Sequence, residues 1–314
     1  MSAPATLAES PAPVSADSAA GCTAKAAQAM SPDVVPALPA TPAAKTYPPL
    51  KTYAADDIAG MAKGMKEDGY VVIPGVLNAA EVAEARRRID DLTPFHYDRK
   101  DGGIDHFKNI FNRTPYWLKF IDHPKVIGAA EAVMGNDCHI IGETAWRTHP
   151  GHGGWGIHTD QLFFPVEEEL LVSGQVELPV MLATAHFYLD DLDLDLCPTW
   201  IVPGTHKSGR GPGTKPGATG FVGGEERSWR GNEVQPVLVK AGDVMLFRSE
   251  VWHTGSKNIT TDRTRYLIQT HYGRRMMAQK FSPYLDFHFS REVLSQATKR
   301  QRRVLGDHQP GAYD

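Results

Sequence analysis

A histidine and a carboxylate lie two residues apart at His158 and Asp160, just after a turn-rich run of glycine, proline and histidine. Side chains at positions i and i+2 of a β-strand point to the same face, so these two can bind a single ion. A second histidine, His253, follows much later in the chain. Two histidines and one carboxylate that leave other coordination positions open are the ligand set of non-haem Fe(II) oxygenases. The three residues therefore predict an iron site.

The His-x-Asp pattern is weak evidence by itself, since the chain has 13 histidines and repeats the pattern at His96 and Asp98. We interpret that second copy as coincidence, because it lies where a helix gives way to a charged loop. His158 and Asp160 have a different setting, with apolar residues such as Trp155 on both sides. An unpaired carboxylate in apolar surroundings is costly unless it meets a cation, so a metal is expected there.

Two arginines, Arg263 and Arg265, follow His253 at the start of a strand that runs to Tyr272. One of them can turn toward the same cavity as the histidines. A buried arginine needs a carboxylate partner, and a charge-assisted hydrogen bond contributes about 1.5–3 kcal/mol. The arrangement predicts a dicarboxylate co-substrate beside the metal.

The elements that must position these residues begin after an N-terminal tail. Residues 1–45 are rich in Ala, Pro and Ser and predict disorder; a targeting peptide is the less favoured alternative, because this stretch has no arginine. One catalytic domain is expected over residues 46–314. Its first part predicts helices at 54–67, 79–92 and 124–134, a strand at 70–73 and an exposed loop at 98–105.

From residue 137 onward the pattern changes to short β-rich segments separated by glycine and proline. Strands are predicted at 138–147, 156–164, 181–189, 199–202, 234–239, 244–247 and 264–272. Such spacing is typical of a β-sandwich or barrel. The stretch at 291–305 predicts a final helix, and the acidic run at 190–195 predicts a solvated loop rather than a calcium site.

Composition excludes several classes of function. The formal net charge is −4, from 33 Lys+Arg and 37 Asp+Glu, and the short arginine runs fit helix faces better than a nucleic-acid surface. Apolar runs are too short for a membrane span. Three widely spaced cysteines, Cys22, Cys138 and Cys197, indicate neither a disulfide framework nor a zinc knuckle. A cytoplasmic protein without membrane or nucleic-acid partners is expected.

Several motifs in order resemble the phytanoyl-CoA dioxygenase family of Fe(II)- and 2-oxoglutarate-dependent oxygenases. They extend from about Asp56 to Tyr313 and include EDGYVVIPG at 67–75, HTD at 158–160, YLDD at 188–191, VPGTHKSG at 202–209 and HTGSKN at 253–258. The resemblance implies a mainly β fold with flanking α-helices, namely the double-stranded β-helix, or jelly roll, of cupin type.

The resemblance also implies roles for individual residues. His158, Asp160 and His253 would bind Fe(II), and Arg265 would pair with the distal carboxylate of 2-oxoglutarate. The family's arginine would fall on Thr264, so a one-residue insertion at 259–261 is assumed, which leaves Arg263 at the surface. Further co-substrate contacts are expected from Ser256, from Lys108, which matches a lysine of relatives, and from His186, which stands where relatives carry an aromatic residue.

Substrate contacts are expected from residues near the open side of the metal, although core packing is an alternative for each. These residues are Trp146, Arg147, Phe163, Tyr188 and Trp252. An anionic substrate would follow if Arg147 faces inward and Trp146 outward, but the sequence alone does not fix which of the two points to the site.

The activity implied by the resemblance is the hydroxylation of an unactivated C–H bond, with O2 consumed and succinate and CO2 released. Desaturation, epoxidation and ring closure remain alternatives, and ascorbate is the expected reductant in vitro. A small molecule of secondary metabolism is the favoured substrate, because no basic groove for coenzyme A is evident. The competing hypotheses are a non-catalytic jelly-roll binding protein and a zinc-dependent cupin-type enzyme that uses His149 or His152.

Overall fold

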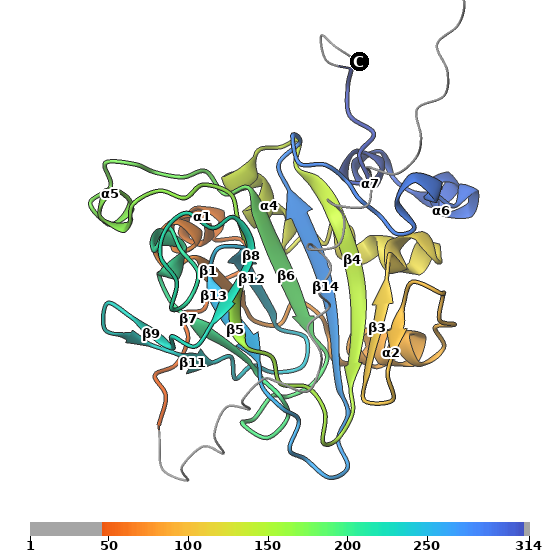
Figure 1. The fold of residues 1–314 in the computed structure, drawn as a ribbon. Coiled ribbons are helices and arrows are strands. Elements are labelled where there is room, and N and C mark those ends of the chain that lie inside the picture. The colour runs from red at the N-terminus through yellow and green to blue at the C-terminus, as the bar shows by residue number, and fades with distance from the viewer. Residues whose placement is uncertain (1–45, 311–314) are drawn as a thin grey trace, which may run out of the picture. The chain divides into compact units, whose positions relative to one another are not determined.

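Two antiparallel β-sheets dominate residues 46–310, the part of the chain that the computed structural model describes (Figure 1). The larger sheet has seven strands, in the order β1 (Tyr70–Ile73), β12 (Val244–Arg248), β6 (Leu182–Tyr188), β14 (Arg265–Gly273), β4 (His139–Thr148), β3 (Ile104–Lys108) and β2 (Arg99–Lys100). The smaller sheet has five, in the order β11 (Gln235–Pro236), β7 (Thr199–Val202), β13 (Trp252–Gly255), β5 (Ile157–Leu162) and β8 (Gly220–Gly224). A short hairpin joins β9 (Ser228–Trp229) to β10 (Asn232–Glu233).

Helices cover the outer face of the larger sheet. They are α1 (Ile58–Glu67), α2 (Ala79–Asp90), α3 (Leu118–Ile121), α4 (Ile127–Met134), α6 (Arg291–Gln296) and α7 (Lys299–Val304), while α5 (Glu168–Val172) lies in the loop after β5. Residues such as Met61, Val82 and Ile127 pack with Phe187 and Ile268 of the sheet in the main apolar core. Asn78 begins α2 in a reciprocal capping box with Glu81, which satisfies backbone donors that the first turn leaves free.

The inner face of the larger sheet packs on the smaller sheet. Tyr188, Leu267 and Phe247 contribute to a second core that also contains Ile201 of β7 and Val237. Adjacent residues of a strand point to opposite faces, so β14 contributes both to this core and to the helical side. The space between the sheets is where inward-facing polar residues can meet.

Three cross-strand rows form the inner face of the larger sheet. One row contains Ile104, Thr148 and Arg265, and the next contains Arg99, His106, Trp146, Leu267 and Tyr188. The third contains Lys108, Thr144, Gln269, His186 and Met245. Together these rows place residues from six strands along one surface.

The predicted strands at 70–73 and 199–202 have the predicted bounds, and five of the other predicted strands form with ends that differ by a few residues. The loop prediction for 98–105 was wrong, because β2 and β3 form a hairpin there. The predicted helix at 291–305 is two helices, since Ala297 is extended and Thr298 caps α7. The segment at 234–239 pairs only at β11, and the third predicted helix begins at Ile127.

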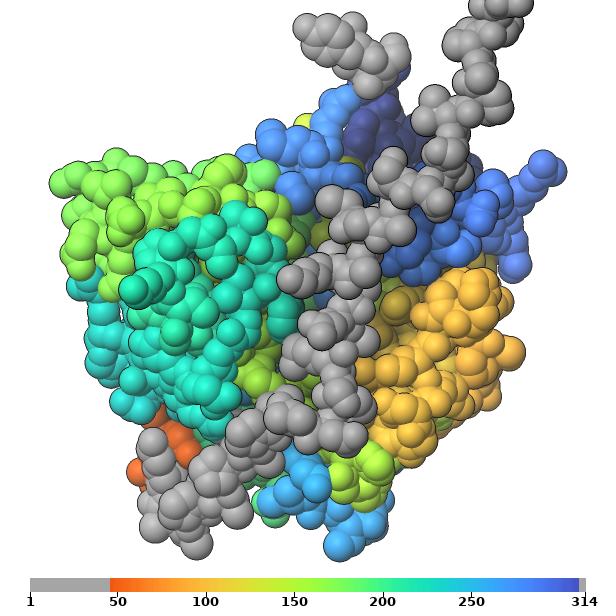
Figure 2. Space-filling view, in the orientation of Figure 1, coloured from red at the N-terminus to blue at the C-terminus, as the bar shows by residue number. Residues whose placement is uncertain are grey.

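In the space-filling view of Figure 2, the teal segment that includes β8 and the gold segment that includes β3 lie on opposite sides of the face shown. The described helices are all too short or too polar to cross a membrane. Cys138 and Cys197 are buried free thiols. The predicted disorder of residues 1–45, with Cys22, lies outside the described residues.

Candidate metal and co-substrate site

The three predicted metal ligands meet in the smaller sheet. His158 on β5 and His253 on β13 are direct cross-strand partners, and Asp160 follows on the same face of β5. An Asp160 carboxylate oxygen lies 3.7 Å from Nε2 of His158 and 3.6 Å from Nε2 of His253. Potential ligand atoms of all three residues lie within 4.8 Å of one another. This donor set, two imidazoles and one carboxylate with other positions open, fits a non-haem iron.

Backbone carbonyls orient both imidazoles. Nδ1 of His158 lies 2.7 Å from the Gly156 carbonyl oxygen, and Nδ1 of His253 lies 2.9 Å from that of Val251. A carbonyl oxygen only accepts hydrogen bonds, so each Nδ1 carries the proton and each Nε2 presents its lone pair. Burial and the neighbouring His253 lower the pKa of His158 to about 4, which keeps its imidazole neutral and able to bind a metal.

Arg265 is the buried arginine of the site, and it comes from the larger sheet. Its side chain lies beside the Tyr188 ring, and Nη2 donates to the Thr199 hydroxyl at 3.3 Å. Its Nε is buried without a hydrogen-bond partner, and no carboxylate of the described residues pairs with its guanidinium. A buried arginine with free donors is a receptor for an anion. Arg263, in contrast, pairs with Asp193 at the surface.

Two polar residues hold the backbone on either side of Arg265. Asn258 is buried; it donates to the carbonyl oxygens of Thr148 and Arg263, and its own side-chain oxygen accepts from Thr260. These bonds close the loop at 259–261, where a one-residue insertion is assumed from the family resemblance. Asp190 accepts from the Tyr266 amide at 2.6 Å and pairs with Arg86 of α2.

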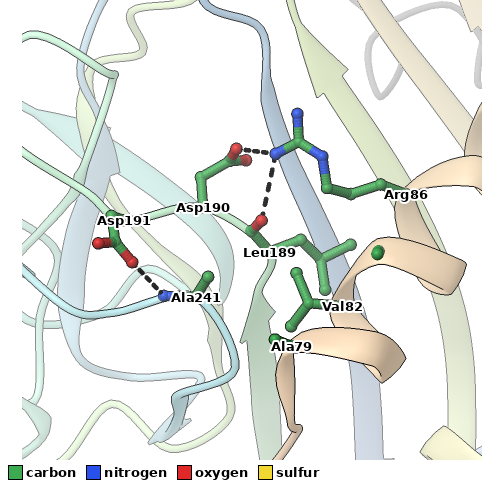
Figure 3. A pocket seen from close by; sticks show the side chains of 8 residues that line it. Ala79, Val82, Arg86, Leu189, Asp190, Asp191 and Ala241 are labelled. Atoms are coloured by element: carbon green, nitrogen blue, oxygen red, sulfur yellow. Dashed lines mark hydrogen bonds and ion pairs between the residues drawn. The ribbon is translucent and has the colours of Figure 1, made fainter.

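Figure 3 shows the Asp190 pair at the rim of an open surface pocket of about 670 Å³. Arg86 also donates to the Leu189 carbonyl oxygen, and Asp191 accepts from the Ala241 amide. The acidic loop after β6 is therefore more than a solvated turn, because the Asp190 carboxylate, the first in the loop, holds the start of β14.

A hydrogen-bonded chain runs along the inner face beside the metal ligands. The Trp146 indole donates to Gln269, whose amide lies 2.8 Å from Nε2 of His186. His186 in turn faces the Tyr188 hydroxyl, which donates to Thr199. Burial, followed by the charge of Arg265, lowers the pKa of His186 well below its usual value. Sequence reasoning missed Gln269, although its alternation with Arg265 on one strand was a usable signal.

The structure separates the predicted substrate contacts. Trp146 and Tyr188 point to the inner face, but Arg147 points away, because Asp105 and Asp90 hold its guanidinium. Trp252 also points away from the site, in a cluster with Ile157, Val202 and Trp229. Both residues are corrections to the expected set. Phe163 lies beyond the end of β5 beside Phe164.

The remaining predicted residues occupy distinct places. His186 and Lys108 lie in one row of the inner face, while the Ser256 hydroxyl donates to the Pro198 carbonyl oxygen. His149 contacts Asp105 and, like His152, is outside the ligand cluster formed by the described residues. The second His-x-Asp copy is no metal site, since Asp98 pairs with Arg113 in the interior.

Comparison with known protein families matches residues 65–266 to phytanoyl-CoA dioxygenase (PhyH). Among known proteins, dioxygenase af480 of Aspergillus fumigatus is 22% identical over 221 residues, or 66% of this chain and 64% of that protein. Phytanoyl-CoA dioxygenase domain-containing protein 1 of Rattus norvegicus is also 22% identical, over 67% of this chain and 87% of that protein. The chain thus spans less than two thirds of the fungal relative.

Solved structures show the same fold. The epimerase SnoN, in complex with Fe3+, alpha ketoglutarate and nogalamycin RO, is 23% identical with a TM-score of 0.52, over 69% of this chain and 84% of that chain. The carbocyclase SnoK from nogalamycin biosynthesis is 18% identical with a TM-score of 0.53, and the match covers 79% of this chain and 94% of that chain. HygX from Streptomyces hygroscopicus, with nickel and 2-oxoglutarate bound, is 15% identical with a TM-score of 0.53, and the match covers 74% of this chain and 95% of that chain. The predicted jelly roll is confirmed.

Proposed function

Because the chain belongs to the phytanoyl-CoA dioxygenase family of non-haem Fe(II)- and 2-oxoglutarate-dependent enzymes, we propose that it hydroxylates an unactivated C–H bond of a small organic molecule. In this proposal His158, Asp160 and His253 bind Fe(II), and residues 46–314 form the catalytic domain. The observation that carries it is the meeting of these three side chains opposite a buried arginine that has no carboxylate partner among residues 46–310.

Each residue has a defined task. The two Nε2 atoms and the Asp160 carboxylate hold the metal, and the Gly156 and Val251 carbonyls keep the imidazoles in the tautomer that binding requires. Arg265 fixes the distal carboxylate of 2-oxoglutarate, with Thr199 beside it, and Lys108, His186 and Ser256 are further candidates for co-substrate contacts. When bound, Fe(II) supplies the redox chemistry by which O2 oxidises 2-oxoglutarate to succinate and CO2.

Asp160 would favour hydroxylation, since it would help to hold the metal, whereas related halogenases have a small residue in place of the carboxylate and admit chloride. A small molecule of secondary metabolism is the substrate that we propose. The proposal draws support from two proteins of the same fold: one structure of SnoN contains nogalamycin RO, and one structure of HygX contains hygromycin B. The buried free thiols Cys138 and Cys197 fit a reducing compartment such as the cytoplasm.

The test is succinate formation from 2-oxoglutarate with Fe(II), O2 and ascorbate. We expect His158→Ala to abolish both succinate formation and the weak visible absorption band that Fe(II) and 2-oxoglutarate form together without oxygen. His288→Ala is the matched control, because His288 is exposed and lies in the segment between β14 and α6. Equal succinate from His158→Ala would refute the iron assignment. Absence of both signals from the parent protein would favour a binding protein or a zinc enzyme.

A further inference from the structure

The β2–β3 hairpin adds a polar wall to the inner face of the larger sheet. Arg99 of β2 is the direct partner of His106 of β3, and His106 is the direct partner of Trp146 of β4. Along β3 the burial alternates: Asp105 and Phe107 are buried, whereas Ile104, His106 and Lys108 are only half-buried. The side of the hairpin that continues the metal-facing surface is therefore the accessible side.

Arg99 lies close to two indole rings. Its guanidinium carbon lies 5.8 Å from the centre of the Trp146 ring and 5.1 Å from that of Trp155. Cation–π contacts at these distances satisfy the face of the guanidinium but not its in-plane N–H groups. Arg99 thus joins the larger sheet to the loop that leads into β5.

The in-plane edge of Arg99 makes no hydrogen bond to the described residues. The side chain as a whole is 39% exposed, yet Nε and Nη2 are buried and have no hydrogen-bond partner among the described residues. Asp101 forms an ion pair with Arg99 in which one carboxylate oxygen lies 3.4 Å from Nε, too misaligned for a hydrogen bond. The other oxygen of Asp101 accepts from backbone amides of the turn. Nε and Nη2 together form the side of the guanidinium that binds a carboxylate through two parallel hydrogen bonds.

His106 offers a further polar atom beside this edge. Its ring stacks on Trp146 with centroids 3.6 Å apart and an angle of 14° between the planes, and its buried Nε2 also has no partner within residues 46–310. Burial, with added repulsion from Lys108 and Arg99, lowers the pKa of His106 well below its usual value. The neutral ring can donate one hydrogen bond without adding a second fixed charge.

This cluster is connected to the metal ligands. Trp155 lies three positions before His158 in the chain, and its amide donates to the carbonyl oxygen of Gly255, which ends the strand that carries His253. Trp155 and Trp146 both remain half-buried, so part of each indole is available for contact. A molecule bound here would lie along the inner face, beside the route to the metal.

We propose that Arg99, His106 and the two indoles bind an aromatic substrate through a carboxylate group that it carries. The carboxylate accepts two hydrogen bonds from Nε and Nη2 of Arg99 and one from Nε2 of His106, and the aromatic body packs on Trp146 and Trp155. This inference rests on the proposed function, since it names the substrate class of the same site. It also replaces Arg147, which the structure turns away, as the residue that recognises an anion.

The test uses the enzyme loaded with Fe(II) and 2-oxoglutarate under anaerobic conditions. Three aromatic acids, namely benzoate, 1-naphthoate and indole-3-carboxylate, are titrated alongside their primary amides, and the change in the visible band gives each dissociation constant. We expect at least one acid to bind about 30-fold more tightly than its amide, which corresponds to one strong charge-assisted pair. Arg99→Gln should abolish that preference, Arg99→Lys should restore part of it, and the exposed Arg291→Gln is the matched control.

The outcomes separate this inference from the proposed function. If the band fails to form before any acid is added, the proposed function fails. If the band forms but no acid changes it, or acids and amides bind equally, the carboxylate assignment is refuted. A preference that survives in Arg99→Gln would also refute it. His106→Phe keeps the stack on Trp146 and removes only Nε2, so it should weaken acid binding by a smaller factor, about 3- to 10-fold.

Discussion

Arg265 is the residue whose replacement tests the co-substrate site most directly. Replacing it with leucine removes the buried guanidinium while keeping an apolar side chain beside Tyr188. The distal carboxylate of 2-oxoglutarate then loses the buried cationic partner that Arg265 provides. We expect the apparent affinity for 2-oxoglutarate to fall, with little change in the stability of the protein, because an unpaired buried charge is removed.

The size of the effect follows from the donors that Arg265 leaves free. Its Nε is unpartnered and its Nη2 makes only a 3.3 Å contact with Thr199, so two charge-assisted hydrogen bonds to a carboxylate are available. At the lower limit of about 1.5 kcal/mol for each, their loss amounts to about 3 kcal/mol, or roughly 100-fold in affinity. The lower limit applies because part of this energy is offset by desolvation of the carboxylate.

The assay compares 2-oxoglutarate with 2-oxopentanoate, which has the same chain length but lacks the distal carboxylate. The parent protein should prefer 2-oxoglutarate by about 100-fold in CO2 release, the product common to both compounds, and Arg265→Leu should lose that preference. Arg263→Leu is the control, because Arg263 lies at the surface with Asp193. The assignment of Arg265 would be refuted if Arg263→Leu lost the preference instead, or if Arg265→Leu retained it.

Two further predictions concern carboxylates away from the metal. Asp190→Asn weakens the contacts with Arg86 and the Tyr266 amide, so the free energy of unfolding in urea should fall by about 1–3 kcal/mol; an unchanged value would contradict the role of Asp190 in fixing β14. Glu143 is fully buried on β4, and neither of its carboxyl oxygens has a hydrogen-bond partner among the described residues. Burial raises the pKa of Glu143 well above 4.5, and the nearby Thr270 hydroxyl and Phe111 amide offset this rise only in part. A raised folded-state pKa means that the folded protein holds the proton more tightly, so stability is lost as pH rises above about 4.5. Glu143→Gln should therefore be more stable than the parent at pH 8 and lose that advantage toward pH 4.5, and a pH-independent difference in urea unfolding would contradict this reasoning.

The ligand set could be predicted because it depends on local spacing and on one long-range partner. His158 and Asp160 share a strand face by parity alone, and His253 was the candidate that followed an apolar strand. The same rule could have excluded Trp252 from the substrate contacts, since it precedes His253 on one strand and adjacent residues of a strand point to opposite faces. The sequence contained the information needed for that correction.

Other features depended on tertiary pairing. Which of Trp146 and Arg147 points to the site follows from the register in which Leu267 pairs with Trp146. Asp105, which holds Arg147, lies on a hairpin that was predicted to be a loop. The charged, glycine-containing stretch at 98–105 has no strand-like hydrophobic pattern, and β3 is stabilised there by its pairing with β2 and β4. Local propensity is overruled by such contacts.

The pairing of His158 with His253 has a consequence for the stability of the smaller sheet. These two residues are the cross-strand pair that joins β5 to β13, so a metal bound by both would bridge this seam between strands that are far apart in sequence. Any local opening of the seam separates the ligands and must release the ion. Metal occupancy and seam opening are therefore thermodynamically linked: at a free metal concentration 100 times the dissociation constant, opening would cost about 2.7 kcal/mol more than in the apo protein. In the metal-bound protein, amide hydrogen exchange of β5 and β13 would report the free energy of metal binding.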